Sequence, residues 1–352
     1  KMAAICELLS AGIIEKDHQG DVLWTWSYPT VSSEQRELLS RKCCLNQKNA
    51  DLTQFVFGHW KKTWFYIYTA EMKESDRLPK IHSFSLVLTT KDYNPEKYET
   101  LSRILCKQFA RNGNPAHLLE CYLSVVTRGL CNNEENGTFI VKEFDARQAY
   151  ANVEIKSIIQ SLGMEAILVY TALMLKKRVI VYHPKVDELL RFTRTLPCLV
   201  WHRQNWDILY PYVHLDDEEL KSFESQRHYV VGCTDAAIET RTDLYDIFIA
   251  VPTHEVTVAP NAKDSLAMSK LHKDVAVTMV NSAANEELSD QQVIKEIAKK
   301  TKELLNNLKT LATPNEEGVG YITLEALRER KMQPATEHFL YNLAMCEGLV
   351  QL

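Results

Sequence analysis

Short hydrophobic runs rich in β-branched and aromatic residues recur along the first 90 residues of the chain, and polar turn-forming stretches separate them. Such runs, bounded by turn residues, predict strands. One helix ending near Cys44 is also expected, because Ser32 and Ser33 precede Glu34 and Gln35 in an order typical of a helix start. We expect one antiparallel sheet with strands at residues 5–15, 22–28, 55–60, 63–69 and 82–90.

The strand at residues 22–28 carries a run of aromatic residues. Trp24, Trp26 and Tyr28 occupy every second position, so strict alternation puts all three on one face of the sheet. We expect Trp24, in the middle of the strand, to pack mainly in the core. Trp26 and Tyr28 lie near Pro29, which ends the strand, and we expect them to form a partner surface.

Apolar positions change to helical spacing after Asn94-Pro95-Glu96, which is a typical helix opening. The predicted helix runs through Phe109, and the sequence N-G-N-P at residues 112–115 ends it. A second helix follows as far as Arg128. The polar stretch at residues 131–138 is the best domain boundary in the chain.

Short apolar strands alternate with helices in the second half of the chain. Such an order is typical of an α/β sandwich, in which helices cover a buried sheet. The pattern after Ala262 is helical throughout. We expect helices at residues 164–177, 186–196 and 217–223, and strands at residues 178–183, 229–233, 246–251 and 255–259.

Composition and charge exclude several classes of function. The 352 residues are 45% hydrophobic and 25% charged, which indicates a folded protein of two or three domains. The net charge of -5 gives no basic excess for a phosphate backbone, so nucleic acid is not an expected partner. Nine cysteines without a C-x-x-C pair predict buried thiols in a reducing compartment. We expect no signal peptide and no transmembrane segment, and therefore a cytosolic protein.

Motifs for covalent or metal chemistry are absent from the sequence. It contains no phosphate-binding loop of the G-x-x-x-x-G-K-[ST] type, no G-x-G-x-x-G, no H-E-x-x-H and no G-x-S-x-G. The acidic run at residues 216–219 lies where a helix begins, and we interpret it as helix capping. We therefore expect no catalytic residue, no metal and no cofactor.

Three blocks of the second half resemble the DENN domain family. The stretch S-L-G-M-E-A-I-L-V-Y-T-A-L-M-L-K-K-R-V-I-V-Y-H, from Ser161, resembles an apolar helix that leads through a basic turn into a buried strand. L-V-W-H-R-Q-N-W-D-I-L-Y-P-Y-V-H-L and H-Y-V-V-G-C-T-D resemble the family's W-x-x-P-Y-x-P and F-x-x-G blocks, with Tyr212 and Gly232 in the matching places. The resemblance implies an α/β fold in four parts: an α+β longin-like lobe at residues 1–130, a linker at 131–144, a doubly wound α/β central lobe at 145–285 and a small helical part at 286–352.

DENN modules typically act as guanine nucleotide exchange factors, so the resemblance implies a Rab family GTPase as partner. It also implies a cytosolic protein that is recruited to late or recycling endosomes. In the family the Rab sits across the longin-like and central lobes. Aromatic residues and the basic helix end are the candidate contacts, although packing and helix-end stabilisation are alternative roles for them. The candidates are Trp26, Tyr28, Lys176, Lys177, Arg178, Trp201, Trp206, Tyr210 and Tyr212.

The resemblance also leaves other functions open. A short family member that the whole chain resembles is associated with the Commander (CCC-retriever) endosomal recycling assembly, through coiled-coil subunits. A non-catalytic subunit that binds those coiled coils, with Trp26 and Tyr28 in contact, is therefore the alternative. An arginine finger that activates a GTPase has precedent in remote longin-DENN relatives, with Arg103, Arg111 and Arg128 as nominal candidates.

Overall fold

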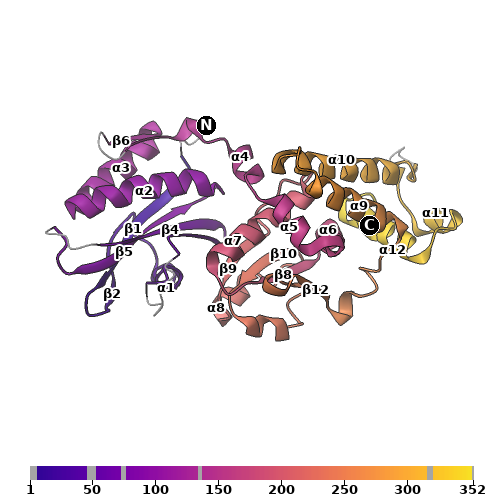
Figure 1. Ribbon diagram of the computed structural model, residues 1–352, viewed down its shortest axis with the longest axis horizontal. Helices are drawn as coiled ribbons and strands as arrows, with labels where there is room; N and C mark the ends of the chain where they lie inside the picture. Colours follow the sequence, from indigo (N-terminus) through magenta and orange to yellow (C-terminus); the bar gives the residue numbers. More distant parts are fainter. Residues whose placement is uncertain (1–5, 46–52, 73–76, 134–136, 315–319, 351–352) are drawn as a thin grey trace. The chain divides into compact units, whose positions relative to one another are not determined.

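The computed structural model describes residues 6–45, 53–72, 77–133, 137–314 and 320–350 (Figure 1). The chain divides into two compact units, residues 1–150 and residues 151–352. Both units combine helices with a sheet, which confirms the expected α/β class. The four-part division of the chain implied by the family resemblance stays a prediction.

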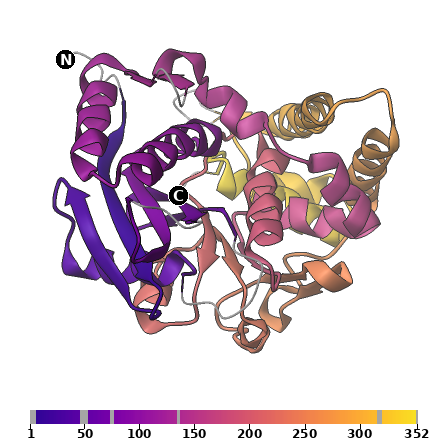
Figure 2. The same ribbon diagram turned by 60° about the vertical axis from the view of Figure 1, so that its left-hand side comes forward.

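The first unit is built on an antiparallel sheet, as the β-rich runs predict (Figure 2). The strand order is β2-β1-β5-β4-β3, so β2 and β3 form the two edges. Large side chains fill its centre, and Trp64, Tyr66 and Phe84 are almost fully buried. The strands are β1 Leu8–Asp17, β2 Val22–Tyr28, β3 Phe55–Trp60, β4 Thr63–Glu71 and β5 Ile81–Thr90.

Three capped helices cover this sheet: α1 Ser33–Lys42, α2 Pro95–Asn112 and α3 Pro115–Arg128. Helices α2 and α3 lie on one face, and α1 lies on the other (Figure 1). The side chain of Ser32 accepts a hydrogen bond from the Gln35 amide, and that of Asn94 accepts one from Lys97, so each satisfies a free amide at a helix start. The predicted helix starts are confirmed.

The polar stretch after α3 contains paired strands, which its sequence pattern does not predict. Strands β6 Leu130–Asn133 and β7 Gly137–Ile140 form a two-stranded antiparallel sheet, while residues 134–136 lie outside the described part. Cys131 and Phe139 on these strands are buried. These two side chains belong to the buried interior of the first unit.

The second unit is built on a mainly parallel sheet of order β12-β11-β8-β10-β9. Only the edge pair β11–β12 is antiparallel. A Cβ atom on Gly232 would lie 2.2 Å from the carbonyl oxygen of Pro211, so glycine lets β10 pack closely against β9. The strands are β8 Arg178–Tyr182, β9 Leu209–Val213, β10 Tyr229–Cys233, β11 Ile247–Ala250 and β12 Glu255–Val258.

The helices of the second unit precede, connect and follow its strands. A 3₁₀ turn, Gly163–Glu165, separates the apolar helices α5 and α6. The stretch Ala146–Met174 is long and apolar enough to span a membrane by length and composition, against the sequence expectation. However, it is divided among three helices and most of its apolar window is buried, as in the core of a globular unit. The helices are α4 Ala146–Ala151, α5 Ile155–Leu162, α6 Ala166–Met174, α7 Val186–Thr195 and α8 Asp217–Lys221.

The carboxy-terminal part is helical, as predicted, except for the short pair β13 Thr313–Pro314 and β14 Gly320–Tyr321. Its helices are α9 Lys270–Ala284, α10 Asp290–Lys309, α11 Leu324–Glu329 and α12 Pro334–Cys346. Arg203 connects this part to α6, because its guanidinium donates to the carbonyl oxygens of Leu173 and Met174, both at 2.6 Å. The same guanidinium pairs with Glu347, 144 residues away, at 2.5 Å.

Candidate functional site

The aromatic strand β2 contains a bulge that changes which residues share a face. Trp26 pairs with Ile13 and Trp24 pairs with Ile14, so Thr25 has no residue opposite it. Side chains of directly paired residues lie on the same face, and the neighbours Ile13 and Ile14 point to opposite faces. Trp24 and Trp26 are therefore on opposite faces of the sheet, and the expectation of one shared aromatic face is wrong.

Trp24 lies on the face that α1 covers. Its indole Nε1 donates to the Ser40 hydroxyl at 2.7 Å and to the Arg36 carbonyl oxygen at 3.1 Å. The Arg36 guanidinium lies 5.9 Å from the Trp24 ring centroid, in cation–π range. A Cβ atom on Gly12 would lie 2.3 Å from this indole, so the glycine leaves room for the ring. Trp24 is half-buried and anchors α1 to the sheet.

Trp26 and Tyr28 lie on the other face of β2, together with Leu23, which is not among the candidates predicted from the sequence. Leu23 pairs with Glu15 and Tyr28 pairs with Ala11, on the same face as the Ile13–Trp26 pair. The bulge thus aligns Leu23, Trp26 and Tyr28, which we call the β2 apolar row. Leu23 is 65% exposed, Tyr28 is 39% exposed and Trp26 is half-buried.

One side of the β2 apolar row is supported by α3. The Tyr28 ring packs edge-on against that of Tyr122, with 5.4 Å between the centroids. The Tyr122 hydroxyl donates to the Leu9 carbonyl oxygen at 2.9 Å, which fixes this ring. Tyr28 is therefore held in place while part of its surface faces solvent, as an interface anchor requires.

In the second unit, the structure buries three of the four aromatic candidates. Trp206, Tyr210 and Tyr212 are only 2–3% exposed. Tyr210 packs against Phe223, with centroids 5.6 Å apart, and its hydroxyl accepts a hydrogen bond from Gln226. The hydroxyls of Tyr210 and Tyr212 have partners inside the unit, because both residues lie on β9, whose side chains are all buried. These three residues are core residues in this structure; Trp201, which is half-buried, remains a surface candidate.

The three basic residues that follow α6 also differ in role: one serves the fold and two lie at the surface. Arg178 donates from Nη2 to Oδ1 of Asp246 at 3.2 Å and from Nη1 to the Asp243 carbonyl oxygen at 2.6 Å. Burial raises the pKa of Asp246, but the hydrogen bonds and charge of Arg178 outweigh it and hold that pKa below its usual value. Arg178 is therefore a structural residue. Lys176 is exposed and Lys177 is half-buried, so both stay available to a partner.

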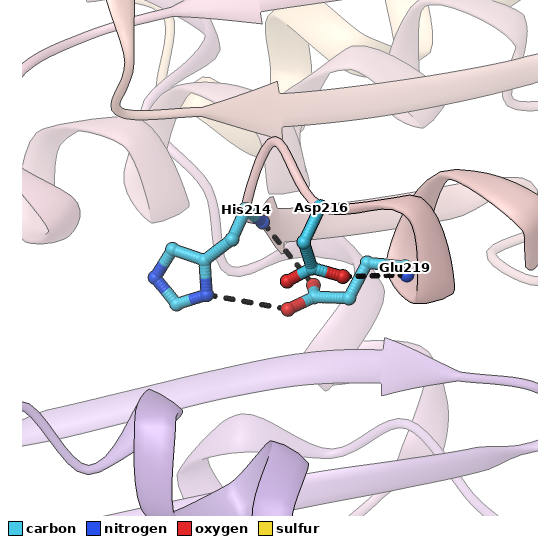
Figure 3. Close-up of side chains that lie close together, drawn as sticks. All are labelled: His214, Asp216 and Glu219. Carbon is cyan, nitrogen blue, oxygen red and sulfur yellow. Dashed lines mark hydrogen bonds and ion pairs between the residues drawn. The ribbon is translucent and has the colours of Figure 1, made fainter.

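A cluster of His214, Asp216 and Glu219 precedes and begins α8 (Figure 3). Their ligand atoms lie within 4.8 Å of one another, and no other such trio occurs in the described ranges. Asp216 Oδ1 accepts from the Glu219 amide at 2.9 Å, which confirms the predicted capping role. His214 Nδ1 lies 3.2 Å from Glu219 Oε1, and its Nε2 lies 3.2 Å from the Tyr212 hydroxyl. These contacts order the turn between β9 and α8.

Comparison with known proteins adds two findings. Residues 152–260 match the family described as SPA, Stabilization of polarity axis. The chain is 47% identical to human DENN domain-containing protein 10 over 98% of its own length and 97% of the human protein. It is 46% identical to the Danio rerio protein of that name, over 98% of both chains, and 40% identical to the Dictyostelium discoideum one, over 97% of both. The chain therefore belongs to the DENN domain-containing protein 10 family.

Proposed function

We propose that this protein is a guanine nucleotide exchange factor for a Rab GTPase, which promotes GDP release and GTP loading. Its proposed setting is late endosome homeostasis, positioning and endosomal trafficking, with recruitment from the cytosol to late or recycling endosomes. Family membership over 98% of the chain carries the proposal, because DENN domains generally have this activity.

Nucleotide exchange is consistent with a sequence that lacks phosphate-binding and catalytic motifs. The Rab brings its own nucleotide, so the missing phosphate-binding loop is no obstacle. An exchange factor needs no acid, base or nucleophile, since it acts by binding the nucleotide-free Rab more tightly than the GDP-bound form. If its affinity for the nucleotide-free Rab is roughly 10⁴-fold higher than for the GDP-bound Rab, the Rab shifts from almost wholly GDP-bound to almost wholly nucleotide-free.

Lys176, Lys177 and Trp201 are the residues of the second unit that we propose for the Rab contact. They are the central-lobe candidates that remain at the surface, while Arg178 and the three buried aromatic residues serve the fold. Lysines at an interface rim increase the association rate with an acidic partner more than they increase affinity. A tryptophan provides a large rigid contact area.

Affinity measurements with nucleotide-free and GDP-bound Rabs test this proposal. We expect this protein to bind the nucleotide-free form of at least one Rab much more tightly than its GDP-bound form. The Lys176→Glu variant should bind that Rab more slowly, whereas Lys299→Glu, which makes the same charge change on an exposed site of α10, should not. Equal affinity for both forms of every Rab would contradict an exchange role.

The β2 apolar row favours a second function: a non-catalytic subunit that binds the coiled-coil heterodimer of the Commander (CCC-retriever) assembly. Coiled coils present apolar side chains between charged flanks, and an exposed row of large apolar residues on an edge strand can pack against them. Leu23 and Tyr28 are 65% and 39% exposed and share one face of β2 with Trp26, so they form a row rather than isolated exposed residues.

Charge substitution in the row tests the second function. Trp26→Asp or Tyr28→Asp should abolish co-purification with the coiled coils while circular dichroism stays unchanged. Val277→Asp is the matched control, because Val277 is a 40% exposed apolar residue on α9, outside the row. Unfolding of the two variants would instead assign Trp26 and Tyr28 to the core.

A further inference from the structure

The turn of Lys176 and Lys177 after α6, which we call the lysine turn, has an unusual backbone. Lys176 has a φ of 50°, in the left-handed region that favours glycine. Its amide donates to the Leu173 carbonyl oxygen at 3.1 Å, and the Lys177 amide donates to that of Ala172 at 2.8 Å. Two such bonds form the Schellman motif that ends many helices, and glycine usually occupies the position of Lys176 in it. The lysine therefore holds a strained conformation that a glycine would relieve.

Arg203 holds the helix end that carries the lysine turn. Its guanidinium donates to the carbonyl oxygens of Leu173 and Met174, both at 2.6 Å. Carbonyl groups in the last turn of a helix lack helical partners, so the arginine supplies donors that α6 cannot. Glu347 orients the same guanidinium through an ion pair at 2.5 Å, and the two side chains are only 13% and 19% exposed. The planar fork of arginine serves these acceptors together, whereas the single ammonium of lysine cannot.

A histidine fixes the lysine turn as well. Nδ1 of His228 donates to the Lys177 carbonyl oxygen at 2.8 Å. Arg203 also follows Trp201 by two residues, and its amide donates to the Val200 carbonyl oxygen at 3.0 Å. One side chain thus joins the lysine turn to the loop that carries the other proposed contact. A strained backbone that several contacts hold in place is typical of a functional site.

We propose that Arg203 is a positioning residue for the Rab contact: it holds the lysine turn in its left-handed conformation and joins it to the loop of Trp201. The inference rests on the proposed exchange function and deepens it, because it accounts for how contacts from two segments of the chain are presented together. Arg203 acts through the lysine turn, while Lys176 meets the Rab and gives up the stability that glycine would provide at its position.

Glycine substitution separates the role of Lys176 from stability. Lys176→Gly should raise the urea midpoint of unfolding, because glycine adopts the left-handed conformation freely. The same change should slow association with a nucleotide-free Rab by roughly two- to tenfold. Lys331→Gly is the matched control, because Lys331 is an exposed lysine with a φ of 52° at the same position after α11. It should raise the midpoint and leave association unchanged. A midpoint that does not rise in Lys176→Gly would overturn the strained turn.

Hydrogen–deuterium exchange of the full chain tests the positioning without a Rab. In Arg203→Lys, the amides of Lys176 and Lys177 should exchange with solvent roughly tenfold faster or more, because their helix end is no longer held. Amides in the sheet of the first unit should keep their protection, which shows that the variant is folded. Arg203→Gln, which is neutral, serves as a second variant with the same expected result. Unchanged protection of the lysine turn in a folded variant would overturn the proposal.

Association kinetics then test whether the positioning serves the Rab contact. Lys176→Glu should slow association with nucleotide-free Rab by roughly two- to tenfold in the wild-type background, but by less than about twofold in Arg203→Lys, because the two residues act as a unit. Equal effects in both backgrounds would show that Arg203 supports the fold alone. If no Rab binds, the exchange function itself is contradicted, and the amide measurements separately decide whether Arg203 holds the lysine turn.

Discussion

Trp24 and Trp26 are separated by one residue in the chain but lie on opposite faces of the edge strand β2. The bulge at Thr25 produces this arrangement, because it adds one residue to β2 that β1 does not match. Trp24 then packs with α1, while Trp26 aligns with Leu23 and Tyr28. One bulge therefore separates an aromatic residue of the fold from those proposed for a partner.

Leu23 provides a direct test of the β2 apolar row. Leu23→Asp should weaken coiled-coil binding by roughly tenfold or more, because it places an unpaired charge in an apolar contact. The free energy of unfolding should change by less than about 0.5 kcal/mol, since the side chain is 65% exposed. Isothermal titration with the coiled-coil heterodimer and urea unfolding measure the two effects. Unchanged affinity would remove Leu23 from the contact.

Gly12 is expected to be essential for the position of Trp24. Gly12→Ala places a methyl group 2.3 Å from the indole, so the ring must move, at a cost of about 1–3 kcal/mol of unfolding free energy. Replacing Trp24 by Leu in the Gly12→Ala background should recover part of that loss, because the smaller side chain leaves room. Urea unfolding followed by circular dichroism gives the comparison. Strictly additive losses would show that the two residues are not coupled.

Glu347 should make stability dependent on pH in acid. Burial raises its pKa, but hydrogen bonds from His202 and Arg203 lower it to about 2, from an ordinary value of 4.5. A depressed pKa in the folded state means that the stabilisation is fully present above pH 4.5 and is lost as the pH falls towards 2. The contribution is about 2–3 kcal/mol. Glu347→Gln should remove this dependence, as measured by thermal unfolding between pH 5 and pH 3. An equal slope in both proteins would contradict the pairing.

His272 should make stability depend on pH in a higher range than Glu347 does. Burial lowers its pKa from 6.5 to about 4, and its ring packs on Phe339 with 4.3 Å between centroids. The neutral ring therefore stabilises the fold above pH 6.5, and this stability is lost as the pH falls towards 4. His272→Gln keeps an acceptor for the Ser269 amide, so it retains the capping box of α9 without the titration. Between pH 6.5 and 5 the variant should lose less stability than the wild type; a greater loss would contradict the assignment.

Local sequence signals predicted the elements of the fold well. Ser32 and Asn94 cap the helices that they were expected to start, and runs of β-branched and aromatic residues between turn residues located all five strands of the first sheet. These features depend on residues close together in the chain. The contact between Arg203 and Glu347 joins residues 144 positions apart, and no local sequence pattern predicts it.

The candidate site was harder to predict, for two physical reasons. The face of Trp26 depends on a bulge, and a bulge is set by pairing with β1 rather than by the sequence of β2 alone. Tyr210 and Tyr212 have the amphipathic chemistry of interface residues, but all side chains of the edge strand β9 are buried, and the two hydroxyls lie against Gln226 and His214. Large apolar residues out of phase with the alternation, such as Leu23, are the one signal that could have revealed the bulge.

Release of a fluorescent GDP analogue from a panel of Rab GTPases tests the central claim most directly. Catalytic amounts of this protein should accelerate release from at least one Rab, at a rate that rises linearly with its concentration. Lys176→Glu should reduce that rate and Lys299→Glu should not. A flat panel, with release from every Rab at its intrinsic rate, would contradict the exchange function and leave the coiled-coil subunit as the supported alternative.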